Sequence, residues 1–169
     1  MSLFISVNFD EKTKQNIAAV QRRLKKFGHG RFSREENFHL TLAFLGEVPE
    51  ERVADVKAAM SRVTVPEMTL VFHKTGCFRR DSGEIWWIGA EENETLSALQ
   101  RDLMKELKAA GFRPDDHGRF RPHITLAREM HAGRPGPEAL LPEPFSAHVG
   151  SIHLMLSHRP DGKLTYTEL

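Results

Sequence analysis

Two stretches of the chain, FHLTLAFLG and FRPHITLAR, place polar residues at alternate positions of an otherwise apolar run. The polar residues are His39 and Thr41 in the first stretch, and His123 and Thr125 in the second. Because successive side chains of a β-strand project to opposite faces, each histidine shares a strand face with its threonine. A single His-x-Thr pattern carries little information, but its repetition indicates that the four polar side chains serve one purpose.

The segments that precede the two motifs are also alike. Residues 3–9, LFISVNF, predict a strand, and EIWWIGA at residues 84–90 predicts its counterpart. Each strand is followed by apolar residues at helical spacing and then by a glycine, Gly28 or Gly111, that ends the helix. The two apolar stripes are Ile17, Val20, Leu24 and Phe27, and Leu96, Leu99, Leu103 and Leu107. The chain therefore contains a duplicated unit of strand, helix, loop and His-x-Thr strand.

Further elements are expected outside these two units. Asp10 is placed to cap the first helix, and residues 53–63 predict a further helix that Pro49 opens. The Pro- and Gly-rich residues 131–144 predict a loop with at most one helical turn. Additional strands are expected near residues 68–72, 145–149 and 152–157.

These units predict a single bilobal α+β domain over residues 1–169. We expect duplicated antiparallel sheets related by a pseudo-twofold axis, with helices packed on the outer faces and a central cleft. Trp86 and Trp87 are adjacent in a strand, so one should fill the core and the other should border the cleft. The apolar partners of the motifs should point toward the helices: Leu40, Leu42, Ile124 and Leu126.

Composition limits the classes of function. The formal net charge of +1 excludes a strongly basic coat protein, although a local anion site remains compatible with it. Cys77 is the only cysteine, which excludes an intramolecular disulfide and fits a reducing, cytoplasmic compartment. No run of eighteen apolar residues occurs, so we expect no membrane span. Because the duplicated lobes already supply both sides of a cleft, we also expect a monomer.

The chemistry of two imidazoles and two hydroxyls favours phosphate over a metal ion. Hydroxyls are weak zinc ligands, and the motifs contain neither thiolates nor carboxylates, so we expect no metal and no cofactor. Threonine hydroxyls can donate to phosphate oxygens, while one protonated histidine acts as acid and one neutral histidine as base. Such a pair suits in-line displacement at a reactive phosphodiester, and a strained 2',3'-cyclic phosphate is such a substrate.

The motifs HLTLAFLGE and RPHITLAR, together with GCF at residues 76–78 and IHLMLS, resemble the two-histidine phosphoesterase superfamily. Within it they are most similar to the RNA 2',3'-cyclic phosphodiesterase branch, also described as 2'-5' RNA ligase-like. The resemblance spans nearly the whole chain. It implies metal-independent hydrolysis of RNA-terminal 2',3'-cyclic phosphates to 2'-phosphates, with weak 2'-5' ligation in reverse, and RNA ends as the partner.

The resemblance also implies roles for individual residues. His39 resembles the general acid that protonates the leaving 3' oxygen, and His123 resembles the base that activates water. Thr41 and Thr125 match the hydroxyls that hold the phosphate.

Phe44 and Arg128, each five residues after its motif histidine, match the positions that sandwich a nucleobase. In a regular strand Phe44 would share the face of Leu40 and Leu42, so a bulge or strand end is needed to turn it toward the cleft.

Two alternatives remain open from the sequence. The chain could be a related two-histidine phosphodiesterase that acts on 2'-5' oligonucleotides or nucleotide cyclic phosphates, because these enzymes share the motifs. It could instead be a non-catalytic RNA- or nucleotide-binding module whose histidines only hold phosphate.

Overall fold

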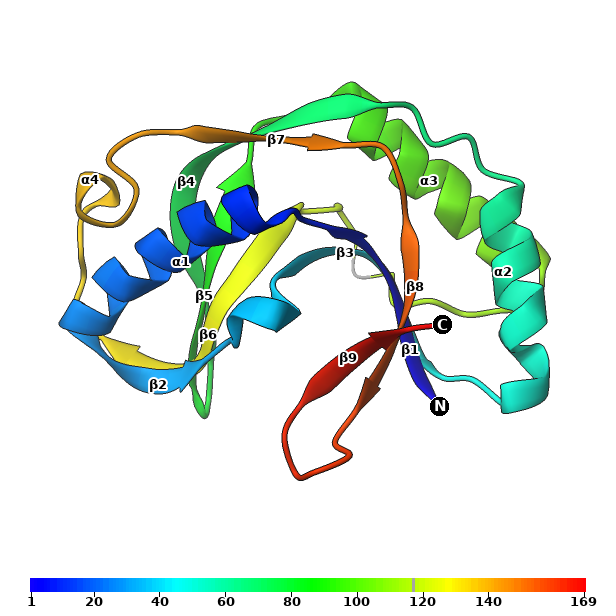
Figure 1. The fold of residues 1–169 in the computed structure, drawn as a ribbon, viewed down its shortest axis with the longest axis horizontal. Coiled ribbons are helices and arrows are strands. Elements are labelled where there is room, and N and C mark those ends of the chain that lie inside the picture. The colour runs from blue at the N-terminus through cyan, green and yellow to red at the C-terminus, as the bar shows by residue number, and fades with distance from the viewer. Residues whose placement is uncertain (117) are drawn as a thin grey trace.

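The computed structural model describes residues 1–116 and 118–169. Within these residues, nine strands form one antiparallel sheet in the order β7-β4-β5-β6-β3-β1-β8-β9, with β2 also paired to β6 (Figure 1). The strands are β1 (Ser2–Asn8), β2 (Gly28–Phe32), β3 (His39–Glu47), β4 (Met68–Arg80), β5 (Gly83–Ala90), β6 (His123–Ala132), β7 (Phe145–Val149), β8 (His153–His158) and β9 (Thr165–Glu168). The α-helices are α1 (Glu11–Leu24), α2 (Val53–Ser61), α3 (Glu94–Ala109) and α4 (Pro137–Leu140).

The sheet repeats itself about the junction of β3 and β6. β1 lies beside β3 and β8 beside β1, while β5 lies beside β6 and β4 beside β5. β3 and β6 meet through the residue pair Leu40 and Ile124. Figure 1 shows β4, β5 and β6 on one side of the molecule and β1, β8 and β9 on the other. The predicted α+β class with duplicated antiparallel sheets is confirmed, and the two sheets are continuous with each other at this junction.

The helix of each unit packs on the strands of the other unit. α1 contacts β6, β7 and α4, whereas α3 contacts β3 and α2. Gln21 of α1 donates a hydrogen bond of 3.0 Å to the carbonyl of Leu126 in β6, and Gln100 of α3 donates one of 3.4 Å to the carbonyl of Leu42 in β3. This exchange was not predicted, because an apolar stripe indicates a buried helix face without specifying the strands that cover it.

Only one of the two predicted apolar helix stripes is buried along its whole length. In α1 the residues Ile17, Val20 and Leu24 are buried, but Phe27 is 38% exposed. The inclusion of Phe27 was wrong, because the α-helix ends at Leu24 and a 3-10 turn over Lys25–Phe27 rotates it away from the stripe. All four leucines of the second stripe are buried.

The predicted helix boundaries depend on local caps. The Asp10 carboxylate accepts a hydrogen bond of 2.8 Å from the amide of Thr13, as expected of an N-cap. After α3 the chain turns at Gly111, which has a φ of 92° that glycine adopts without strain.

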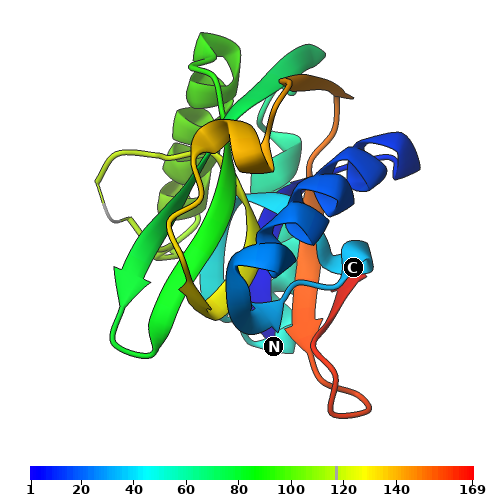
Figure 2. The same ribbon diagram turned by 90° about the vertical axis from the view of Figure 1, so that its left-hand side faces the viewer.

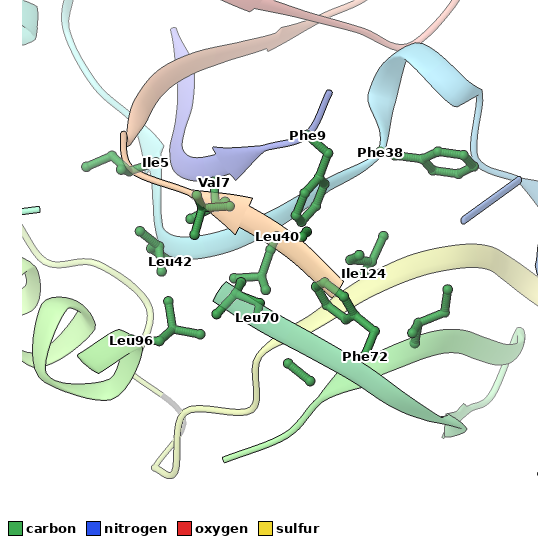
Figure 3. Close-up of a cluster of buried hydrophobic side chains, with 14 of the residues drawn as sticks. Ile5, Val7, Phe9, Phe38, Leu40, Leu42, Leu70, Phe72, Leu96 and Ile124 are labelled. Carbon is green, nitrogen blue, oxygen red and sulfur yellow. The ribbon is translucent and has the colours of Figure 1, made fainter. Parts of the chain in front are cut away.

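The core lies where the two halves of the sheet meet. Figure 3 shows Leu40 and Ile124 beside side chains of β1, β4 and α3. The expected inward residues Leu40, Leu42, Ile124 and Leu126 are all buried. Trp86 is buried as well, whereas Trp87 is half-buried and its ring centroid lies 6.3 Å from that of His123, so the expectation of one core and one cleft tryptophan is confirmed.

The segment 131–144 contains one helical turn, as predicted. β6 continues through Ala132, and α4 forms the turn. Leu140 of α4 is buried, and its carbonyl accepts a hydrogen bond of 3.0 Å from Arg23 of α1. This contact anchors the segment to the first helix.

Candidate active site

Both motif histidines stand at the first position of their strands and are oriented in the same way. Nδ1 of His39 lies 2.7 Å from the carbonyl of Asn37, and Nδ1 of His123 lies 2.6 Å from the carbonyl of Arg121. A carbonyl can only accept, so Nδ1 is the protonated nitrogen of each ring. In the neutral form, Nε2 of each histidine is therefore the nitrogen available for proton transfer.

The two Nε2 atoms have different neighbours. Nε2 of His39 lies 2.9 Å from the hydroxyl of Thr41, which donates to it when the imidazole is neutral. Within the described part of the chain, neither Nε2 of His123 nor the hydroxyl of Thr125 has a hydrogen-bond partner. The first half of the site is thus internally hydrogen-bonded, and the second half is open.

The pKa values of the two histidines depend on residues from both halves of the site. Burial is the main reason that the pKa of His39 is lowered from 6.5 to about 4, and the nearby charges of His123 and Arg128 lower it further. The pKa of His123 is lowered by burial first and then by Arg128. At neutral pH the unliganded site holds two neutral imidazoles beside one guanidinium, an arrangement that attracts an anion.

Aromatic rings flank His39 on its side of the site. The ring of Phe4 lies 4.8 Å from that of His39 between centroids, and the ring of Tyr166 meets it edge-on at 5.1 Å. These rings, with Ser6 and Asn8, border a small pocket of about 70 Å³. Burial raises the pKa of Tyr166, so its hydroxyl stays protonated at neutral pH. Phe4 and Tyr166 were not predicted as site residues, because neither belongs to a motif.

A second pair of rings flanks His123. Phe78 meets it edge-on at 5.5 Å between centroids, and Trp87 lies 6.3 Å away. These residues border a cleft of about 1240 Å³ that extends toward α3. Within the described residues, the larger open space therefore adjoins the second histidine.

Matching irregularities follow the two motifs. Between β1 and β3 the partner of Ile5 is Ala43 and the partner of Ser6 is Thr41, so Leu42 is an extra residue. The same shift occurs between β5 and β6, where Leu126 is the extra residue. A bulge of this kind resets the alternation of side chains.

The bulges turn Phe44 and Arg128 away from the core. Leu42 and Ala43 are both buried and Phe44 is 42% exposed, while Leu126 and Ala127 are buried and Arg128 is exposed. The bulge that the cleft orientation of Phe44 required is present. Phe44 and Arg128 therefore share the sheet face of the motif histidines, and the influence of Arg128 on the pKa values of His39 and His123 places its charge near both rings.

The exchanged helices support these bulges. The carbonyls of the extra residues Leu126 and Leu42 are the atoms that accept from Gln21 and Gln100, respectively. The Leu126 carbonyl also accepts a hydrogen bond of 2.9 Å from the backbone amide of Ser33. No sequence motif contained these glutamines, since their contacts depend on tertiary packing.

The described residues contain no group of three or more His, Cys, Asp or Glu side chains that could hold a metal ion. None of the helices in residues 1–116 and 118–169 has the length and apolarity needed to cross a membrane.

Comparison with known proteins identifies the family. The model of the 2'-5' RNA ligase superfamily matches residues 9–161. The chain belongs to this superfamily. Its membership confirms the family that the motifs resemble.

Relatives of this superfamily member include a protein of Archaeoglobus fulgidus named RNA 2',3'-cyclic phosphodiesterase. The two are 33% identical over 76% of this chain and 72% of the relative. An Escherichia coli protein with the same name is 29% identical over 99% of this chain and 93% of its own length. The solved structure of E. coli LigT complexed with 3'-AMP has 27% identity and a TM-score of 0.82, and covers 99% of this chain and 94% of that one.

Proposed function

We propose that this superfamily member hydrolyses RNA-terminal 2',3'-cyclic phosphates to 2'-phosphates, with histidines rather than a metal ion as the reacting groups. The observation that carries the proposal is the paired geometry of His39 and His123, each with Nδ1 anchored to a backbone carbonyl so that Nε2 is the nitrogen left for proton transfer. The names of the A. fulgidus and E. coli relatives support the substrate class.

In this mechanism His123 acts first as a base. Its unpaired Nε2 accepts a proton from water, and the water oxygen forms a bond to phosphorus. The bond from phosphorus to O3' breaks, and His39 supplies a proton to O3'. The cyclic ester opens to a 2'-phosphate and a free 3' hydroxyl.

His39 must acquire its proton when substrate binds. Its pKa of about 4 leaves it neutral in the unliganded protein, but a bound phosphate is an anion that opposes this shift. Once Nε2 is protonated, it no longer accepts from Thr41, and the hydroxyl becomes available to donate to a phosphate oxygen. Thr125, whose hydroxyl has no partner in the described part of the chain, is the complementary donor.

Phe44 and Arg128 bind the nucleobase in this proposal. Their bulged positions put an exposed ring and an exposed guanidinium on the sheet face of the histidines. Both groups stack well on a base and do so with little sequence preference. The protein would therefore accept different terminal nucleotides.

The same groups permit weak 2'-5' joining of RNA ends. In joining, an RNA 5' hydroxyl takes the place of water, so His123 is again the base and His39 the acid. By microscopic reversibility, the two roles are exchanged when a 2'-5' linkage is cleaved. We further propose a monomeric protein, since one chain supplies both histidines, and a cytoplasmic location, which its single cysteine favours.

A chelator-treated turnover assay tests the proposal. The substrates are a nucleoside 2',3'-cyclic phosphate, a short RNA with the same terminus and a 2'-5' dinucleotide. His39→Ala and His123→Ala should each lower turnover about 10²- to 10⁴-fold. His148→Ala, which removes an exposed strand histidine beside Glu67, is the matched control and should leave turnover unchanged.

Either of two results would contradict the proposal. Binding of cyclic phosphate without turnover would indicate a nucleotide-binding module. Turnover of the 2'-5' dinucleotide alone would keep the two-histidine chemistry but assign a different phosphodiester as substrate.

A further inference from the structure

The C-terminal strand β9 reaches the first motif histidine although it is not a neighbour of β3 in the sheet. Strands β1 and β8 lie between β3 and β9, and Figure 2 shows β8 beside β1 with β9 folding back from it as a hairpin. In a flat sheet, three strand spacings would hold β9 about 14 Å from β3. The sheet curls instead, and the ring of Tyr166 lies 5.1 Å from that of His39 between centroids.

Three aromatic rings from three strands meet at this point. Phe4 of β1 lies 4.8 Å from His39 and 4.8 Å from Tyr166 between ring centroids, so each ring contacts the other two. The plane of Phe4 is tilted by 38° from the imidazole, whereas Tyr166 meets the imidazole edge-on at 89°. Such packed rings interact in specific orientations, and here they restrict rotation of the imidazole.

Hydrogen bonds from the same hairpin fix the carbonyl that holds the imidazole. The side-chain amide of Asn37 donates a hydrogen bond of 2.9 Å to the carbonyl of Leu164, the residue before β9. Arg34 donates to the same carbonyl at 3.2 Å. The backbone carbonyl of Asn37, a buried residue, in turn accepts from Nδ1 of His39 at 2.7 Å. The direction in which Nε2 of His39 points therefore depends on the position of the C-terminal hairpin.

The second histidine has no comparable support. Its Nδ1 donates to the carbonyl of Arg121, but the Arg121 side chain is exposed and makes no hydrogen bond or ion pair with the described residues. The rings beside His123 are Phe78 and Trp87, from the adjoining strands β4 and β5. This difference suits the two proposed roles, because a base can take a proton from a mobile water, whereas an acid must deliver its proton to one fixed atom, O3'.

We propose that Asn37 and Tyr166 are positioning residues for the general acid, which couple the C-terminal hairpin to His39 and direct Nε2 toward O3'. This assignment rests on the proposed function, in which the bond from phosphorus to O3' breaks and the proton of Nε2 passes to O3'. Both residues act through His39 rather than on the substrate. Their loss should therefore lower kcat and leave KM unchanged.

A change of leaving group tests this assignment. The substrates are adenosine 2',3'-cyclic phosphate and its analogue with sulfur in place of the bridging 3' oxygen, whose thiolate leaves without being protonated. Asn37→Ala and Tyr166→Ala should each lower kcat on the oxygen substrate at least about tenfold, because a misplacement of about 1 Å can cost about 10²-fold. Both variants should retain the wild-type kcat on the sulfur substrate. His39→Ala, which lacks the acid, is the reference for this bypass.

Two further variants separate positioning from folding. Tyr166→Phe keeps the ring, and it should retain the wild-type kcat because the Tyr166 hydroxyl has no hydrogen-bond partner in the described part of the chain. Thr167→Ala is the matched control on β9, since the Thr167 hydroxyl lies 2.7 Å from Nε2 of His158, and it should leave both rates unchanged. Tyr166 is half-buried on an edge strand, so Tyr166→Ala tests the assignment even if Asn37→Ala fails to fold.

The outcomes distinguish this assignment from the proposed function. An unchanged kcat of Tyr166→Ala on the oxygen substrate, or an equal loss on both substrates, would overturn the positioning role and leave the proposed hydrolysis intact. Wild-type protein that does not hydrolyse the oxygen substrate, or His39→Ala that hydrolyses it normally, would overturn the proposed function and the positioning role with it.

Discussion

Gln21 donates a hydrogen bond of 3.0 Å from its side-chain amide to the carbonyl of Leu126, the extra residue of the β6 bulge. Gln21 belongs to the helix of the first unit, and Leu126 follows the motif of the second. The same amide nitrogen donates at 2.7 Å to the carbonyl of Ser33. One buried side chain thus ties the first unit to the bulge that turns Arg128 away from the core.

Replacement of Gln21 should therefore affect stability. Gln21→Leu removes both hydrogen bonds from a buried position and should lower the free energy of unfolding by about 1–3 kcal/mol. The comparison is Gln100→Leu in the other half, where the amide is half-buried and its bond of 3.4 Å to Leu42 is longer, so the loss should be smaller. Urea denaturation measures both, and equal losses would contradict the assigned role of Gln21.

The depressed pKa of His39 predicts a pH-dependent stability. A histidine with a pKa of about 4 in the folded state and 6.5 in the unfolded state binds its proton more readily when unfolded. Its contribution is full above pH 6.5 and is lost as the pH falls toward 4, by on the order of 3 kcal/mol. His39→Gln should flatten the loss of stability between pH 7 and 4. An unchanged slope in denaturation experiments at these pH values would show that His39 titrates normally.

Arg128 should control the protonation of both histidines. Its positive charge lowers the pKa values of His39 and His123, so Arg128→Gln should raise both. NMR titration of the histidine ring protons measures the shifts. Arg31→Gln is the matched control, because Arg31 lies opposite Arg128 across β2 and β6 but is paired with Glu129 at 2.8 Å. Identical titrations in wild type and Arg128→Gln would place the guanidinium away from the site.

Phe44 should contribute to substrate binding rather than to folding. Because the ring is 42% exposed, Phe44→Ala should change stability little, but loss of a stacked base should raise KM for a nucleoside cyclic phosphate at least about fivefold. Phe44→Trp should retain binding. The control is Phe27→Ala, a phenylalanine of similar exposure, 38%, that lies outside the site. A KM unaffected by Phe44→Ala would show that Phe44 does not bind the nucleobase.

Much of the fold and of the candidate site could be predicted from the duplicated motifs. A period of two in a strand places His39 with Thr41 and His123 with Thr125, and the matching spacing of both units predicts that the pairs meet. The later part of each strand was harder to predict. HLTLAF and HITLAR contain no glycine to mark the bulges at Leu42 and Leu126, and their register depends on pairing with β1 and β5.

The remaining site residues could not be found from local patterns. Tyr166 reaches His39 from the last strand, and Gln21 reaches Leu126 from a helix more than 100 residues earlier, so both contacts depend on tertiary packing. The sequence also predicted one protonated histidine from the unperturbed pKa. The structure instead gives a neutral unliganded pair, because burial depth is not encoded in the motif.

The position of the phosphate in the product tests the proposed two-histidine mechanism most directly. Adenosine 2',3'-cyclic phosphate would be treated with the chelated protein and the product examined by phosphorus NMR, with His39→Ala and His123→Ala as controls. We expect adenosine 2'-phosphate as the sole product and its loss in both variants. A 3'-phosphate would contradict the assignment of His39 to the leaving O3', and turnover that persists in either variant would contradict the two-histidine mechanism.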